Sequence, residues 1–288
     1  MDLIKIKEIL DRASIHYSEN LVIIKKQDNP EVYKIESGKN NLVFKIFSDR
    51  SQSLAAEKFY DFAGKNGISV SKLILMKETW ILIAWLDGEL VKNLDKSHQY
   101  ESGIKVGEEL HKMHKILMSG FGWPIDAKNF ISKYSDFNFN FFINKINDFI
   151  RDGCDPYLRD EMNKIFGNES LREILSFKGP VLLHGDLAST NIIVDKKGKC
   201  WFFDPGEIIS GDPMMDLGYS QTSQNSFEFR KGVWEGYVSE KKLSSEEEIR
   251  FKKWKLLLQC YIAYRAMFLN GKRAAEHVSF AEELIKNF

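Results

Sequence analysis

The feature that most constrains the fold is a pair of short apolar runs joined by a tight turn, with polar residues at both outer ends. Residues 192–194 and 200–203 are rich in β-branched and aromatic side chains, and the DKKG sequence that follows the first run is a plausible hairpin turn. Asp186 and Asn191 precede the first run, and Asp204 follows the second. Because the open ends of a hairpin lie side by side, we expect these three side chains to converge at one edge.

The converging groups suit a phosphate–magnesium site. Two carboxylates and one amide oxygen are hard oxygen ligands, which Mg2+ prefers when it is held together with substrate phosphates. An Asp followed after four residues by Asn is also the catalytic-loop spacing of kinases, and Asp204 opens a D-x-G element, Asp-Pro-Gly. We therefore expect Asp186 to accept the proton of an acceptor hydroxyl, and Asn191 and Asp204 to bind Mg2+.

The periodicity of apolar residues changes near residue 87 of the chain. Before this point, short runs rich in β-branched and aromatic residues alternate with turn-like segments. After it, apolar residues recur at the three-and-four spacing of amphipathic helices. These patterns predict an α+β fold of two lobes, a small β-rich lobe over residues 1–86 and a larger, mostly helical lobe over residues 87–288.

One late helix is marked by a capping box. Ser245 stands three residues before Glu248, and Glu246 and Glu247 fall in the positive first turn. We therefore expect a helix that begins at Ser245 and is capped by the Ser245–Glu248 pair.

The charge balance and the cysteines narrow the possible functions. Basic and acidic residues both number 41, so the formal net charge is zero, which argues against a nucleic-acid binder with a basic surface. No apolar run reaches membrane-spanning length, and the N-terminal stretch lacks a signal-peptide pattern. The three cysteines are an odd number without close pairing, so we expect reduced thiols. We expect a cytoplasmic protein that binds neither nucleic acid nor membrane.

Several segments together resemble the aminoglycoside phosphotransferase and choline kinase-like enzymes. The HGD sequence at 184–186 with Asn191 looks like the HGD-x4-N signature of that family. Residues 211–217 resemble its D-P-x-x-D-L element, and residues 107–114 its helical L-x-x-x-H segment. The resemblance covers residues 20–240 in order. It implies a protein-kinase-like fold and a phosphotransferase with an alcohol group as acceptor, such as those that confer antibiotic resistance.

The resemblance also implies that the first lobe binds a nucleotide, ATP or GTP. Lys45 resembles the strand-borne lysine that contacts the α- and β-phosphates, and Glu57 on the following helix is placed to pair with it. The protein-kinase-like fold then indicates which residues contact the base of the nucleotide. Apolar contacts are expected from Ile23, Val32, Val43, Ile83, Ile193 and Phe203, and backbone hydrogen bonds from the hinge residues Ala84, Trp85 and Leu86.

The sequence departs from the kinase pattern in two places. The loop at 27–31 contains no glycine, whereas protein kinases use glycines there so that the backbone can approach phosphate. Pro205 favours an extended backbone at Asp204, as at the end of a strand. The glycine-free loop leaves open an alternative function, a catalytically silent nucleotide-binding scaffold.

The acceptor is indicated only by acidic residues. Glu207, Asp212 and Glu235 would add negative charge on the acceptor side, which suits a small cationic acceptor such as an aminoglycoside. No segment resembles an activation loop, which disfavours a protein substrate. Acceptors of the choline, thiosugar or homoserine type stay open, and so does the choice between a monomer and a homodimer.

Overall fold

A computed structural model describes most of the chain. The described residues are 3–12, 14–15, 21–25, 31–37, 40–124, 130–131, 160, 164, 177, 179–206, 208–268 and 273–288. Glu207, Cys154 and most of the glycine-free loop lie outside them. The other two cysteines, Cys200 and Cys260, are buried free thiols. Among the described helices, none is both long enough and apolar enough to cross a bilayer.

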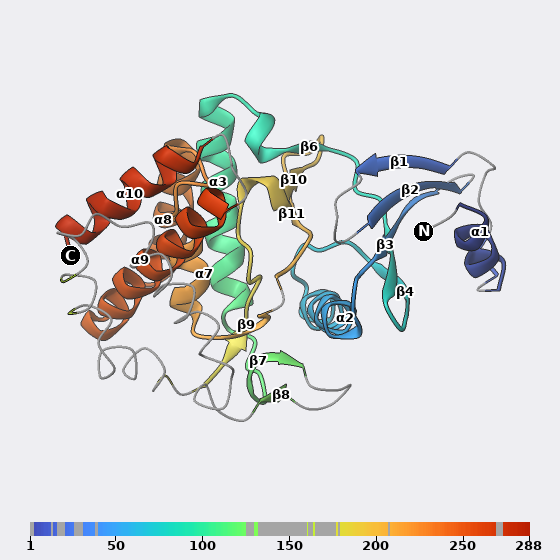
Figure 1. Cartoon of the computed structure of the whole chain (residues 1–288), viewed down its shortest axis with the longest axis horizontal. Helices are drawn as coiled ribbons and strands as arrows, with labels where there is room; N and C mark the ends of the chain where they lie inside the picture. The colour runs from blue at the N-terminus through green and yellow to red at the C-terminus, as the bar shows by residue number, and fades with distance from the viewer. Residues whose placement is uncertain are drawn as a thin grey trace.

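The first lobe is built on a five-stranded antiparallel sheet with the strand order β1-β2-β3-β5-β4. Its elements are α1 (Leu3–Arg12), β1 (Leu21–Lys25), β2 (Glu31–Ser37), β3 (Asn40–Ile46), α2 (Arg50–Lys65), β4 (Leu73–Lys77) and β5 (Trp80–Ala84). The strands lie in the short runs rich in β-branched and aromatic residues that the sequence shows before residue 87. Figure 1 shows this lobe at one end of the molecule, with α1 and α2 beside the sheet.

The two faces of the sheet bury different sets of residues. Phe44 and Leu82 are paired across β3 and β5, and they pack in a buried cluster with Leu10 of α1. The next pair along the same strands, Lys45 and Ile81, lies on the other face, where Ile81 joins the main core together with α2. Because side chains alternate between faces, the register decides which residues face the second lobe.

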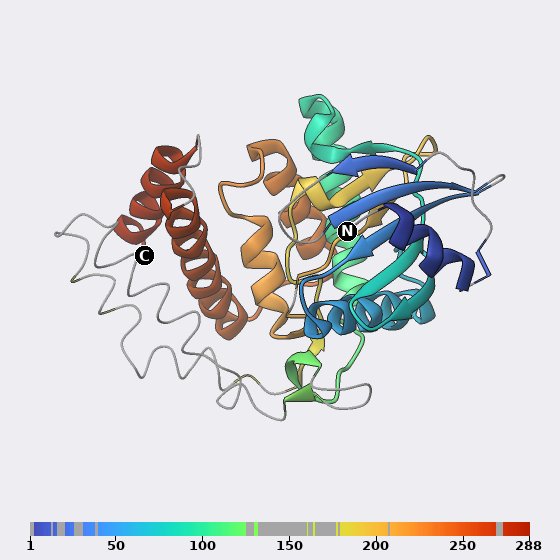
Figure 2. The same ribbon diagram turned by 45° about the vertical axis from the view of Figure 1, so that its right-hand side comes forward.

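The second lobe is mostly helical. The helices described in this lobe are α3 (Lys96–Met113), α7 (Pro213–Ser220), α8 (Phe227–Glu240), α9 (Ser245–Phe268) and α10 (Ala274–Lys286). Figures 1 and 2 show α9 and α10 side by side at the end of the molecule opposite the sheet. The chain therefore has the two-lobe α+β architecture expected from the sequence, with a small β-rich lobe and a larger helical one.

Helices α3 and α8 run parallel and touch backbone to backbone. Gly103 and Gly107 of α3 face Gly232 and Gly236 of α8. A Cβ atom on Gly236 would lie only 2.1 Å from the carbonyl oxygen of Ile104. The close approach of the two helices therefore requires glycine at these positions.

Short strands connect the lobes and line the second one. The first set, β6 (Glu89–Leu90), β10 (Ile192–Val194) and β11 (Cys200–Phe202), forms a three-stranded sheet in the order β11-β10-β6. The second set, β7 (Phe121–Pro124), β8 (Phe130–Ile131), β9 (Val181–Leu182) and β12 (Ser210–Gly211), forms a four-stranded sheet in the order β8-β7-β12-β9. Two 3-10 helices, η1 (Val91–Asn93) and η3 (Ser189–Asn191), precede α3 and β10.

The cap of α9 differs from the predicted one by one residue. The helix begins at Ser245 as expected, but the capping box is made by Ser244 and Glu247. The Glu247 N–H donates to Ser244 Oγ at 3.3 Å, and the Ser244 N–H donates to Glu247 Oε2 at 2.9 Å. The predicted Ser245–Glu248 pair is wrong. Because two serines and three glutamates are consecutive, the capping-box spacing fits both Ser244–Glu247 and Ser245–Glu248. Ser244 is the N-cap because it directly precedes the helix.

Candidate active site

The predicted hairpin is formed by β10 and β11, which pair antiparallel. Its turn is fixed by Asp195, whose Oδ1 accepts two backbone N–H groups at 2.8 and 3.0 Å. At the open end, the Phe203 N–H donates to the Asn191 carbonyl at 3.1 Å. Asn191 and Asp204 are therefore held on neighbouring strands, as the hairpin argument requires.

Asn191 orients the carboxylate of Asp186. Asn191 Nδ2 donates to the Asp186 backbone oxygen and to its Oδ2, both at 2.9 Å. Burial raises the pKa of Tyr219 well above its ordinary value, and the charge of Asp186 is a further cause, so the phenol stays protonated.

The backbone before Asp186 is held by buried polar contacts. Asp216 of α7 is fully buried, and its carboxylate accepts the N–H groups of His184 at 2.6 Å and Gly185 at 2.8 Å. The His184 ring accepts the Asp186 N–H at Nδ1, 3.3 Å away, so its Nε2–H donates to the Phe203 carbonyl at 3.0 Å. His184 and Asp216 thus brace the loop, and neither faces open solvent.

Asp204 does not have the extended backbone expected from Pro205. Its φ angle is 55°, in the left-handed region, where Asp is one of the more tolerant residues at a cost of roughly 1–2 kcal/mol. The turn returns the chain to the catalytic loop, because the Gly206 N–H donates to the His184 carbonyl at 2.9 Å. The local preference is therefore overridden by a contact between distant segments.

Lys45 reaches Asp204 across the two lobes. Its residue is 5% exposed, and Nζ forms an ion pair with Asp204 Oδ1. Within the described residues, no ion pair joins Lys45 to Glu57, which is half-buried on α2. A nucleotide–metal complex would compete for both ends of the Lys45–Asp204 pair. Glu57 stays a prediction for a different state of the protein.

Strand register places several predicted base contacts on the Lys45 face. Val43 pairs with Ile83, and Val32 pairs with Lys45. Directly opposite residues of antiparallel strands share a face, and Val43 lies two residues before Lys45, so all four belong to one face. Ile83 is buried there, and Val32 and Val43 are half-buried.

Strand β1 pairs with β2 through Ile23 and Tyr33 and through Val22 and Lys34. The side chain of Ile23 lies outside the described part of the structure, so its contact with the base stays a prediction. From the second lobe, the predicted contacts Ile193 and Phe203 are half-buried at the hairpin.

The hinge backbone is partly occupied by internal hydrogen bonds. The Ala84 N–H donates to the Lys72 carbonyl at 2.9 Å, and the Ala84 carbonyl accepts from Ser71 Oγ at 2.5 Å. The Trp85 N–H donates to a carbonyl of β3 at 2.9 Å. Among the described residues, no hydrogen bond uses the Trp85 carbonyl or the Leu86 N–H. These two groups are available to a base, and those of Ala84 are not.

Asp212 is not on an acceptor surface, so that prediction is wrong. The residue is 0% exposed and caps α7 by accepting the Met214 N–H at 3.0 Å. Its other oxygen accepts Arg250 Nε–H at 2.9 Å and Trp254 Nε1–H at 3.1 Å. Burial raises the pKa of Asp212, and the Arg250 charge opposes that rise. The sequence shows an acidic residue on a loop but not its burial.

Glu235 is also engaged elsewhere. It accepts a hydrogen bond from the Tyr100 hydroxyl and lies 3.9 Å from Lys231 Nζ, so its charge is shared at the contact of α3 and α8. In the part of the chain that the structure describes, no hydrogen bond or ion pair joins it to the Asp186 loop. Glu207 cannot be placed, because it lies outside the described residues.

Sequence reasoning missed a side chain that holds the loop between Asp186 and Asn191. Asn225 hydrogen-bonds the backbone at Leu187 and Ser189. It belongs to the segment that joins α7 to α8. Its polar sequence QTSQNS predicts only a turn, and no spacing shows which of its side chains point at the loop.

The oxygen atoms of the site fit magnesium bound with phosphates. Because Asn191 Nδ2 is used by Asp186, Oδ1 is free to act as a ligand apart from a 3.3 Å contact with the Thr190 hydroxyl. The Asp204 side chain is 33% exposed. No group of three His, Cys, Asp or Glu residues in the described ranges could hold a metal alone. Phosphate oxygens would therefore have to complete the coordination.

The fold and the site define a phosphotransferase with a protein-kinase-like architecture. A profile of the phosphotransferase enzyme family (APH) matches residues 21–248, which is most of the chain, so the chain belongs to this family. No curated protein matches it in sequence.

Solved structures with the same fold are distant in sequence. A thermostable variant of aminoglycoside phosphotransferase APH(4)-Ia, in a ternary complex with AMP-PNP and hygromycin B, is 15% identical, with 98% of each chain covered and a TM-score of 0.71. A provisionally assigned fructosamine-3-kinase from Thermobifida fusca YX-ER1 is 15% identical, again with 98% of each chain covered, and has a TM-score of 0.68. The gentamicin complex of APH(2'')-IIa is 14% identical, with 100% of this chain and 97% of that chain covered and a TM-score of 0.63. At these identities the likeness shows the fold.

Proposed function

We propose that this protein transfers the γ-phosphate of ATP or GTP to a hydroxyl group of a small molecule. The observation that carries the proposal is the meeting of Asp186, Asn191, Asp204 and Lys45 at the junction of the lobes. In the proposed division of labour, residues 1–86 bind the nucleotide and residues 87–288 carry the catalytic groups and the acceptor site.

Each group has a role that its contacts support. Asp186, oriented by Asn191, accepts the proton of the attacking hydroxyl. Asn191 and Asp204 hold Mg2+, which neutralises charge on the phosphates when it is bound. Lys45, released from Asp204, anchors the α- and β-phosphates, and the Trp85 carbonyl and Leu86 N–H bind the base. Such a site works by positioning and by charge stabilisation.

For the acceptor, we propose a small amine-bearing polyol such as an aminoglycoside. Three structural neighbours support this class: two are complexes with hygromycin B and gentamicin, and the third is a provisionally assigned fructosamine-3-kinase. Asp212 and Glu235 do not, since both are engaged inside the second lobe. Choline-, thiosugar- and homoserine-type acceptors therefore remain as test compounds.

The test is nucleotide turnover with Mg2+ against a panel of aminoglycosides, fructosamines, amino alcohols, sugars and homoserine. We expect turnover that one class of acceptor stimulates, and we expect Asp186→Asn to abolish it while nucleotide still binds. Nucleotide binding without turnover for every acceptor would instead indicate a silent scaffold. No nucleotide binding by thermal shift, with or without Mg2+, would contradict both.

A further inference from the structure

The segment between α7 and α8 holds the catalytic loop through one buried carboxamide. Asn225 is 4% exposed. Its Oδ1 accepts the Ser189 N–H at 2.7 Å, and its Nδ2 donates to the carbonyls of Leu187 at 3.3 Å and Ser220 at 3.0 Å. The contacted groups of Leu187 and Ser189 lie between Asp186 and Asn191. The carboxamide therefore spans the stretch of backbone that sets the distance between these two residues.

Only a carboxamide matches this pattern of donors and acceptors. Leu187 and Ser189 are both buried, so the carbonyl of the first and the N–H of the second need a partner within the protein. A carboxylate at position 225 would satisfy the Ser189 N–H but would set an acceptor against the two carbonyls. Asp at position 225 would therefore have nearly the shape of Asn but would lack the donor that the two carbonyls need.

The same segment also holds the end of α7. Gln224 Nε2 donates to the Tyr219 hydroxyl oxygen at 3.0 Å. Tyr219 is buried, so its ring has a fixed position. The segment is thus bound to α7 through Gln224 and to the backbone of the loop through Asn225.

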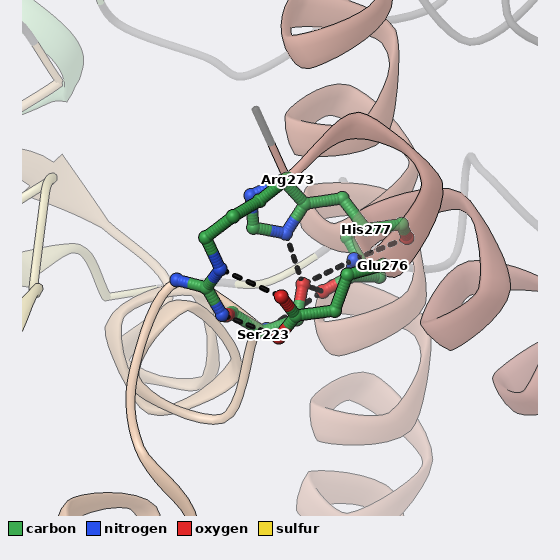
Figure 3. A network of polar contacts seen from close by, with 5 residues as sticks. Ser223, Arg273, Glu276 and His277 are labelled. Atoms are coloured by element: carbon green, nitrogen blue, oxygen red, sulfur yellow. Dashed lines mark hydrogen bonds and ion pairs between the residues drawn. The ribbon is translucent and has the colours of Figure 1, made fainter. Parts of the chain in front are cut away.

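The segment is itself fixed to the C-terminal helices (Figure 3). Ser223 Oγ contacts His277 Nδ1 at 2.6 Å, and its N–H donates to Gln259 Oε1 at 2.9 Å. Arg273, paired with Glu276, donates from Nη2 to the Ser223 carbonyl at 2.8 Å. These contacts tie the segment to α9 and α10, so it cannot shift without disturbing buried polar groups.

We infer that Asn225 is a positioning residue for phosphoryl transfer, which holds the backbone of the loop between Asp186 and Asn191. The inference rests on the function proposed above. Asn225 has no described contact with the nucleotide face of the sheet, so it acts on the chemical step and not on nucleotide affinity in the absence of Mg2+.

The test measures kcat, and the nucleotide Kd without Mg2+, for Asn225→Asp. We expect kcat to fall about 10²-fold, because small misplacements of reacting groups have effects of this size. The nucleotide Kd should stay within about twofold, with one site per chain. The matched control is Ser226→Ala, which removes the hydroxyl that caps α8 at the Phe229 N–H, 3.2 Å away, and does not touch the loop. It should lower the Tm and leave kcat unchanged.

The outcomes separate the two proposals. Wild-type protein without turnover overturns the proposed function, and the inference with it. An active wild type whose variants keep full kcat overturns the inference alone, as does a loss of kcat that only follows a reduced number of nucleotide sites. If Asn225→Asp does not fold, Asn225→Ser decides, since it adds no charge and its hydroxyl both donates and accepts.

Discussion

The sheet face that carries Lys45 and the loop that carries Asp186 are built on different physical principles. On the sheet face, position follows from strand alternation, and a single register step separates a residue that can face the nucleotide from one that faces α1. In the loop, each group is held by several buried hydrogen bonds from α7, from η3 and from the α7–α8 segment. The sheet determines only which side chains share a face, whereas the hydrogen bonds around the loop fix the positions of individual atoms. We therefore expect substitutions on the sheet to change affinity and substitutions around the loop to change the rate.

The strongest test of this difference is Asp186→Asn. We expect kcat to fall by about 10³-fold, because general-base catalysis is lost, while the nucleotide Kd stays the same within about twofold. The measurement is steady-state turnover together with nucleotide binding by titration. Equal losses in kcat and in affinity would mean that the two regions are not separable.

A second test compares two carboxylates that accept backbone N–H groups. Asp216 is buried and serves the catalytic loop, whereas Asp49 is exposed and caps α2 through the Ser51 and Gln52 N–H groups at 2.8 and 3.1 Å. We expect Asp216→Ala to lower the free energy of unfolding by about 3 kcal/mol, because two buried donors lose their acceptor. Asp49→Ala should cost about 1 kcal/mol. Denaturant titration of the two variants checks the ranking, and similar values would contradict the role given to Asp216.

The register of β3 can be tested with two neighbouring residues. Val43 lies on the Lys45 face, and Leu42 lies in the cluster under α1. We expect Val43→Ala to weaken nucleotide binding about fivefold through lost apolar contact. Leu42→Ala should leave the nucleotide Kd unchanged and destabilise the fold by about 2–3 kcal/mol. A weaker nucleotide affinity in Leu42→Ala than in Val43→Ala would mean that the assigned face is wrong.

The smallest predicted effect is a pH dependence at the anchor of the α7–α8 segment. Burial lowers the pKa of His277 below its ordinary 6.5, with the Arg273 charge as a further cause and Glu276 opposing it. The folded state binds the proton of His277 less readily than the unfolded state does. The contribution of neutral His277 to the free energy of unfolding is therefore present above pH 6.5 and is lost as the pH falls through the lowered pKa. The free energy of unfolding of the wild type should fall more steeply below pH 6.5 than that of His277→Gln. Parallel curves for the two proteins would contradict the assignment.

The convergence of Asp186, Asn191 and Asp204 was predictable because their geometry is local. These residues lie around one short hairpin, so their spacing brings them together. The reaction class was predicted from that hairpin and from the family resemblance, and the two-lobe fold from the change in periodicity near residue 87.

What the sequence did not predict depends on long-range packing. The buried position of Asp212 is stabilised by Arg250 and Trp254 on a helix well separated in sequence. Asn225 acts through backbone groups of another segment, and such contacts leave no pattern in the composition of the loop.

The glycine contact between α3 and α8 has a consequence for how this protein can diversify. Gly107 and Gly236 leave no room for any side chain, and they keep His114 at the end of α3 within 3.4 Å of the Asp216 carboxylate that holds the catalytic loop. Substitutions that change the acceptor can therefore accumulate in the surface loops of the second lobe, but not at the glycines where α3 and α8 touch. In a library of random variants selected for activity, we expect these glycines to show the least substitution of any residues outside the reacting groups.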